Sequence, residues 1–95
     1  MVSLNWTPNA LQKLGNILTF LDKHSEIASK TLLNQIKKQL EILKAFPKIG
    51  RIVPERNNQE LREIFIQNYR FLYCFSYDTI NIITVLHFKQ NFNLK

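Results

Sequence analysis

The stretch Leu61–Phe88 reads LREIFI (61–66), QN (67–68), YRFLYCFSY (69–77), DT (78–79) and INIITVLHF (80–88). Three runs rich in aromatic and β-branched residues are separated by two short polar breaks. Such residues favour strands, and a two-residue connection can join only antiparallel neighbours. The stretch therefore predicts an antiparallel meander with tight turns at Gln67-Asn68 and Asp78-Thr79.

The first half of the chain predicts a strand followed by two helices. Residues 2–6 alternate apolar and polar side chains, which indicates a short strand with one apolar face. Thr7-Pro8 is a typical helix start, and leucine, isoleucine and alanine then recur every three or four residues to about Lys23. Ser25 caps a second amphipathic helix that runs from Glu26 to about Phe46. The brief break at 24–25 implies an antiparallel helical hairpin.

The order of these elements defines the fold class. Pro47 and Gly50 end the second helix, a brief extended segment follows at Ile52-Val53, and residues 56–59 are a polar loop. We predict an α+β domain: an N-terminal strand, a helical hairpin on one face of the sheet, and a three- to four-stranded antiparallel meander. The N-terminal strand is expected to pair beside a later strand. Gly15 marks either a close helix contact or a tolerated surface position.

Length and composition restrict the class of protein. A chain of 95 residues forms one domain, 1–95, and the single cysteine, Cys74, cannot form an internal disulfide, which fits a reducing cytoplasm. No apolar run approaches the roughly 18 residues of a membrane span, and the N-terminus lacks the features of a signal peptide. The net charge of +6 favours a polyanionic partner such as nucleic acid, a ribosome or an acidic protein.

Familiar catalytic and metal-binding motifs are missing from the sequence, so we expect no metal site and no cofactor. Arginine, lysine, histidine and glutamate remain, and such a set suits RNA cleavage, in which a base withdraws the 2′-hydroxyl proton and cations stabilise the developing charge. By strand alternation Arg70 lies with Leu72 and Cys74. His87 and Lys89 lie with Ile83 and Val85, and Leu86 and Phe88 lie with Ile82 and Thr84. Strand register decides whether Arg70 and His87 meet.

The chain resembles the RelE/ParE superfamily of toxins from type II toxin–antitoxin modules over nearly its whole length. The resemblance rests on the order and spacing of five segments, which are Phe46-Pro47, Gly50-Arg51-Ile52-Val53-Pro54-Glu55, Leu61-Arg62-Glu63-Ile64, Asn68-Tyr69-Arg70-Phe71-Leu72-Tyr73 and Val85-Leu86-His87. It implies a curved antiparallel sheet packed against two helices. It also implies a cytoplasmic toxin that inhibits growth when free of its antitoxin, an often acidic protein that forms a hetero-oligomer with it.

The superfamily contains two activities. RelE-like members cut mRNA in the ribosomal A site, whereas ParE-like members poison DNA gyrase and perform no chemistry. If the chain is a ribonuclease, the resemblance assigns catalysis to Arg70, His87, Lys89 and Glu55. In either case, Arg51, Arg56 and Arg62 are expected to bind the partner or nucleic acid.

Several sequence features separate the two activities. RelE-like sequences often have a lysine-rich strand before the Tyr-Arg motif and a catalytic tyrosine near the end, whereas this chain offers Arg62 and then Phe88 and Phe92. Its long hairpin and its Val-Pro-Glu, Leu-Arg-Glu-Ile and Val-Leu-His segments are more ParE-like, although the glycine and arginines frequent after the histidine in ParE-like tails are missing. The sequence therefore favours gyrase poisoning, with ribosome-dependent mRNA cleavage as the alternative.

Overall fold

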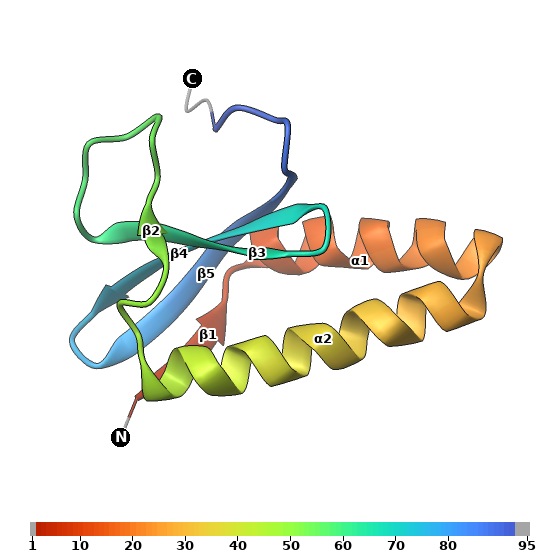
Figure 1. Cartoon of the computed structure of the whole chain (residues 1–95), viewed down its shortest axis with the longest axis horizontal. Coiled ribbons are helices and arrows are strands. Elements are labelled where there is room, and N and C mark those ends of the chain that lie inside the picture. The colour runs from red at the N-terminus through yellow and green to blue at the C-terminus, as the bar shows by residue number, and fades with distance from the viewer. Residues whose placement is uncertain (1, 93–95) are drawn as a thin grey trace.

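The computed structural model describes residues 2–92, which form a helical hairpin packed on a five-stranded sheet (Figure 1). The sheet has the strand order β1-β5-β4-β3-β2. The elements in chain order are β1 (Ser3–Trp6), α1 (Pro8–His24), α2 (Glu26–Ala45), β2 (Arg51–Ile52), β3 (Leu61–Ile66), β4 (Tyr69–Ser76) and β5 (Thr79–His87). This arrangement confirms the predicted α+β fold.

The N-terminal strand pairs with the last strand of the meander. Strand β1 lies parallel to β5, with Ser3 opposite Thr79 and Trp6 opposite Ile82. The other neighbours, from β2 to β5, pair antiparallel as predicted. The expected later partner of β1 is therefore β5, and the parallel pairing was not anticipated.

Side-chain caps set the boundaries of the two helices. The hydroxyl of Thr7 accepts a hydrogen bond from the Ala10 amide (3.2 Å) and donates one to the Ile83 carbonyl (3.0 Å), so it joins α1 to β5. Ser25 ends α1 with its amide and begins α2 with its side chain, which accepts from the Ala28 amide at 3.2 Å. One serine thus serves both helices, which keeps the hairpin connection short.

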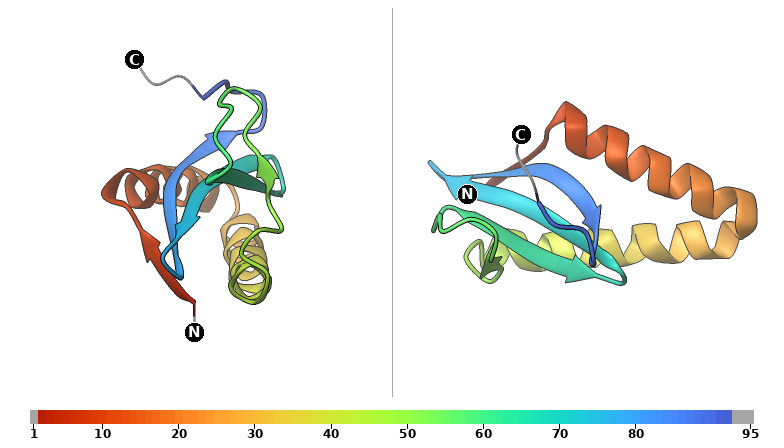
Figure 2. Two further views of the ribbon diagram at one scale, coloured as in Figure 1. Left: turned by 90° about the vertical axis from the view of Figure 1, so that its left-hand side faces the viewer. Right: turned by 90° about the horizontal axis from the view of Figure 1, so that it is seen from above.

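Apolar clusters lie on both faces of the sheet. Two clusters fill the space between the hairpin and the sheet, and Trp6, Leu40 and Ile64 pack against both of them. A third cluster on the opposite face is built on Val53, Leu61, Leu72 and their neighbours and contains no helix residue. Figure 2 shows the loop after β2 and the segment after β5 close together, away from the hairpin.

The sheet departs from the predicted turns and strand faces in two places. The β4–β5 turn is at Tyr77-Asp78, one residue earlier than predicted, and both residues have positive φ. Leu72 pairs with Thr84 but Tyr73 pairs with Ile82, so Ile83 is an unpaired bulge residue. The bulge breaks the period of two. The predicted faces of β5 were therefore wrong: Ile82 lies with Val85 toward the helices, and Ile83 lies with Leu86 in the third cluster.

No helix within residues 2–92 combines the length and the apolar character needed to cross a bilayer. The half-buried Cys74 packs against the third cluster, as expected for a small core residue, and burial raises the pKa of its thiol.

Candidate functional site

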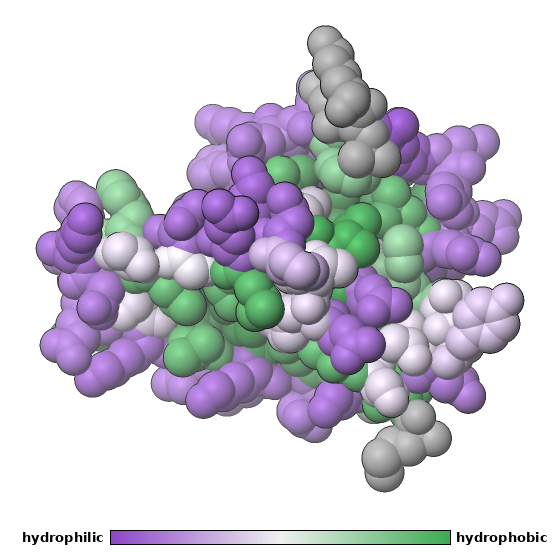
Figure 3. Space-filling view, turned by 180° about the vertical axis from the view of Figure 1, so that it is seen from behind, coloured by the Kyte–Doolittle hydropathy of each residue, from purple (hydrophilic) through white to green (hydrophobic). Residues whose placement is uncertain are grey.

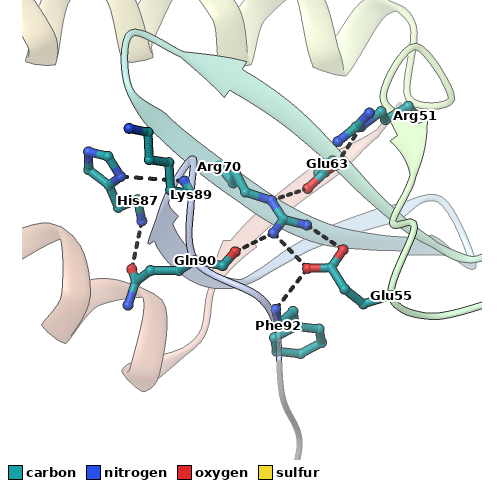
Figure 4. A network of polar contacts seen from close by, with 8 residues as sticks. All are labelled: Arg51, Glu55, Glu63, Arg70, His87, Lys89, Gln90 and Phe92. Carbon is teal, nitrogen blue, oxygen red and sulfur yellow. Dashed lines mark hydrogen bonds and ion pairs between the residues drawn. The ribbon is translucent and has the colours of Figure 1, made fainter.

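Arg70 is the centre of a network of ion pairs on the sheet face that carries the third cluster (Figure 4). Its side chain is only 5% exposed. Nε donates to Glu63 at 2.6 Å, while Nη1 and Nη2 donate to the two carboxylate oxygens of Glu55 at 2.7 and 2.9 Å. Nη1 also donates to the Gln90 carbonyl at 2.6 Å. The guanidinium is thus bound on three sides by groups of the protein itself.

Glu63 connects Arg70 to the edge of the sheet. Its side chain is fully buried, and its second oxygen accepts from Nε of Arg51 at 2.5 Å. Arg51 lies directly opposite Glu63 in the β2–β3 pair, and its guanidinium stacks over the Phe65 ring at 5.0 Å. The pairing of β2, β3 and β4 therefore aligns Arg51, Glu63 and Arg70, and Glu55 from the loop after β2 completes a row of alternating charges.

Glu55 connects the network to the segment after β5. Its carboxylate accepts from the backbone amide of Phe92 at 2.8 Å as well as from Arg70. Hydrogen bonding to Arg70 is the main reason why the pKa of Glu55 is lowered to about 2. The same hydrogen bond raises the pKa of Arg70 above its ordinary value. Both groups are therefore charged throughout the physiological pH range.

His87 and Lys89 lie apart from the Arg70 network. His87 is exposed and pairs with Tyr69, one residue before Arg70, so the two side chains point to opposite faces of the sheet. Its ring lies 6.2 Å from that of Tyr69 and 5.0 Å from that of Phe88, and the Lys89 ammonium lies 5.6 Å from the Phe88 ring. The structure thus brings Arg70 together with Glu55, and His87 together with Lys89, as two separate pairs.

The three arginines expected to bind a partner all make internal contacts. Arg62 donates through Nη1 to the Gly50 carbonyl at 2.9 Å and to the Lys48 carbonyl at 3.3 Å. Arg56 stacks over the Phe92 ring at 5.4 Å. The Arg51 side chain is 58% exposed despite its bond to Glu63, and the Nε donor serves that bond. Arg51 therefore retains guanidinium surface toward solvent.

Two residues that the sequence analysis did not single out are central to this region. Glu63 is the buried carboxylate between two arginines, and its position among buried neighbours in a strand was the available signal. Tyr73 is fully buried; its hydroxyl donates to the Pro47 carbonyl (2.8 Å) and accepts from the Gly50 amide (3.0 Å). Burial raises the pKa of this phenol. The hydroxyl is therefore a structural link, which composition and spacing do not reveal.

The geometry limits what Arg70 and Glu55 can do as an acid–base pair. A hollow of about 350 Å³ lies over the network, lined mainly by Arg51, Pro54, Glu55, Arg70, Phe88 and Gln90. At its base Arg70 and Glu55 neutralise one another, and the Glu55 oxygens are occupied by hydrogen bonds. A carboxylate with a pKa of about 2 is a weak base. Residues 2–92 contain no group of histidine, cysteine and acidic side chains suited to a metal ion.

The chain is similar to known toxin proteins over almost its whole length. A family model described as ParE toxin of type II toxin-antitoxin system, parDE, matches residues 4–92. A comparison with curated protein sequences finds no match.

Solved structures of toxin–antitoxin systems share the fold. A chain of the chromosomal ParDE system from P. aeruginosa has a TM-score of 0.73 at 18% identity, covering 92% of this chain and 96% of that one. A chain of the YoeB–YefM complex from Staphylococcus aureus has a TM-score of 0.59 at 12% identity, covering 92% and 97%. A heterotetrameric YoeB–YefM complex from the same organism gives 0.56 at 12% identity, covering 88% and 93%.

Proposed function

Because this chain belongs to the ParE toxin family of type II toxin–antitoxin systems, we propose that it arrests growth by poisoning DNA gyrase. In this proposal the protein acts by binding and performs no chemistry, and a cognate antitoxin keeps it inactive. Gyrase works on DNA in the cytoplasm, and we therefore place the free toxin there.

The main support for a non-catalytic function is that the guanidinium of Arg70 is occupied by contacts within the protein. An arginine that assists RNA cleavage must direct its donors at the charge developing on phosphate. Here those donors face Glu55, Glu63 and a backbone carbonyl. Freeing Arg70 would leave a fully buried Glu63 without one of its partners, and breaking a buried ion pair costs about 3–5 kcal/mol. The network thus favours a structural role for the family's arginine.

The alternative function, ribosome-dependent mRNA cleavage, depends on the exposed pair of His87 and Lys89. The backbone amide of Lys89 donates to Nδ1 of His87 at 3.4 Å, which leaves Nε2 toward the surroundings. Within residues 88–92 no tyrosine accompanies them, because Phe88 and Phe92 hold the aromatic positions. The alternative therefore predicts activity that depends on these two side chains.

An acidic antitoxin fits the charge and the surface of the molecule. The net charge of +6 favours a negatively charged partner and opposes self-association. Seen from behind, apolar side chains form an uneven band along the hairpin, bordered by polar ones (Figure 3). A disordered antitoxin segment that folds on binding could cover such a band. We propose that the inactive form is a hetero-oligomer of this kind.

One experiment separates the two activities. The protein is induced briefly by itself, and new DNA and new protein are pulse-labelled in the same cells. We expect DNA synthesis to fail first, and purified toxin to trap cleaved DNA on purified bacterial gyrase. The matched variant His87→Ala/Lys89→Ala should retain this activity. Early collapse of translation with cut mRNAs, abolished in that variant, would overturn the proposal. Arg70→Ala is unsuitable here because it removes a core ion pair.

A further inference from the structure

Phe46 and Ile49 are exposed beside the half-buried Phe75, and the exposed Tyr77 follows Phe75 by two residues at the start of the β4–β5 turn; we call these four residues the apolar platform. Phe46 and Ile49 are 64% and 58% exposed, and Tyr77 is fully exposed. Phe46, Ile49 and Phe75 line one hollow of about 350 Å³. Phe75 and Ser76, the residue before Tyr77, line an adjoining hollow with Lys48. The loop after α2 and the β4–β5 turn lie at the same end of the molecule, opposite the hairpin connection (Figure 1).

The loop that contains Phe46 and Ile49 is fixed to the sheet because side chains of the sheet form hydrogen bonds with its backbone. The Tyr73 hydroxyl binds Pro47 and Gly50, and Arg62 binds the carbonyls of Lys48 and Gly50. A Cβ atom at Gly50 would lie 2.6 Å from the Tyr73 hydroxyl, so only glycine allows this approach. The loop is thus held in one conformation although its own apolar side chains face solvent. Such pre-organisation lowers the entropy cost of binding.

Tyr77 has a left-handed backbone conformation that is unfavourable for a residue with a large side chain. Tyr77 and Asp78 have φ of 51° and 55°, the left-handed conformation that favours glycine and asparagine. The ring is fully exposed and therefore gains no burial in the free protein. A residue of disfavoured conformation without a packing role suggests a function outside the fold.

We propose that the apolar platform is the surface through which this protein docks on the folded protein that it inhibits. The proposal rests on the proposed toxin function and names the contact for it. Aromatic residues are frequent among the energetically dominant residues of protein interfaces, whereas nucleic-acid sites are dominated by cations. The adjoining hollow adds Lys48 and Arg62 against one acid, Glu60. The matching partner surface is therefore an apolar pocket bordered by acidic side chains.

The rigidity of the platform indicates a folded partner. A fixed, compact patch suits a pre-formed pocket, because neither surface then has to become ordered on binding. An antitoxin segment that folds on binding needs a longer surface, such as the band along the hairpin in Figure 3. The two partners are thus expected to use different parts of the toxin.

The first test replaces the exposed side chains without disturbing the core. Full-length Phe46→Ser/Ile49→Ser is compared with Phe20→Ser/Ile27→Ser, a matched control at the hairpin end whose side chains are 60% and 78% exposed. We expect the platform variant to need at least tenfold more protein than wild type to trap cleaved DNA on purified gyrase. The control should remain within twofold of wild type. Both variants should keep the wild-type circular dichroism spectrum.

The second test uses Tyr77→Gly, which removes the ring and relieves the left-handed conformation. We expect the thermal midpoint to rise while inhibition of gyrase and growth arrest weaken. A gain in stability with a loss of activity cannot be explained by misfolding. Full activity of Tyr77→Gly and of the platform double variant would overturn the proposal.

Growth arrest in cells separates failure of this proposal from failure of the gyrase proposal. If the wild-type protein arrests growth without affecting gyrase, gyrase is not the target. The platform variants then still test the docking proposal, because they should arrest growth less than wild type. If they arrest growth like wild type, or lose only antitoxin binding in co-purification, the platform is not the target surface. A wild-type protein that does not arrest growth at all would contradict both proposals.

Discussion

At the scale of single residues, the contacts of Arg70 determine what its guanidinium can do. The resemblance noted in the sequence implies a catalytic role for the arginine of the Tyr-Arg segment in β4 if the protein is a ribonuclease. In this chain the guanidinium is buried between Glu55 and Glu63, and both carboxylates are oriented by further donors. Its charge is therefore neutralised within the fold. The identity of the residue is unchanged, and its partners determine what it can do.

Glu55 should make the stability of the protein depend on acid pH. Its folded pKa of about 2 lies below the ordinary 4.5, so its stabilisation is complete above pH 4.5 and is lost as the pH falls toward 2. Glu55→Gln should lower the free energy of unfolding at pH 7 by about 1–3 kcal/mol and flatten the decline below pH 4.5. Urea unfolding at pH 7 and pH 3 measures both effects.

Glu26→Gln is the matched control for this prediction. Glu26 pairs with Lys30 at 3.2 Å, but both side chains are more than 70% exposed. Exposed ion pairs contribute roughly 0–1 kcal/mol, so this variant should change little at either pH. Equal effects of the two substitutions would contradict the role assigned to the Glu55–Arg70 pair.

At the scale of secondary-structure elements, the two glycines differ in whether the structure has room for a larger residue. Gly15 lies on the exposed side of α1, and a Cβ atom there would meet no atom within 4 Å. Of the two sequence interpretations, the tolerated surface position is therefore confirmed. Gly50 is buried in the approach to β2, where Cβ would lie 2.7 Å from the Glu63 carbonyl. Its need for glycine comes from contact with β3 and β4, and its φ is not positive.

This contrast predicts opposite effects of alanine. Gly15→Ala should raise the free energy of unfolding by about 1 kcal/mol, because alanine is the better helix former. Gly50→Ala should lower it by more than about 1 kcal/mol, because the added methyl group displaces the Tyr73 hydroxyl and its hydrogen bonds. Thermal or urea unfolding of the two variants gives the comparison. A stabilising Gly50→Ala would show that the loop can relax at little cost.

At the scale of the whole molecule, the parallel β1–β5 pair connects the start of the chain to its last strand. Trp6 lies at the end of β1, packs against both helix-side clusters and meets Phe71 edge-on at 6.3 Å. The hairpin and the sheet therefore share one core. Segments far apart in sequence must associate before this core exists, which favours cooperative folding.

Trp6 is the single tryptophan of the chain, so its fluorescence reports on the junction between hairpin and sheet. We expect the unfolding curves from tryptophan fluorescence and from far-ultraviolet circular dichroism to coincide, because both follow one transition. Separate midpoints would mean that the hairpin, which contributes most of the dichroism signal, unfolds independently of the sheet. Trp6→Phe provides the baseline for fluorescence.

The periodicity of the chain was enough to predict the two helices, the meander and their layering, because these depend on local patterns of apolar residues and caps. It also indicated which charged residues stand out, among them Arg70 and His87. The tertiary structure alone decided how they are grouped. Register places Arg70 and His87 on opposite faces, and the bulge at Ile83 inverts part of β5. Burial and partners depend on contacts between distant segments, such as Glu55 with Phe92, and these have no local signature in the sequence.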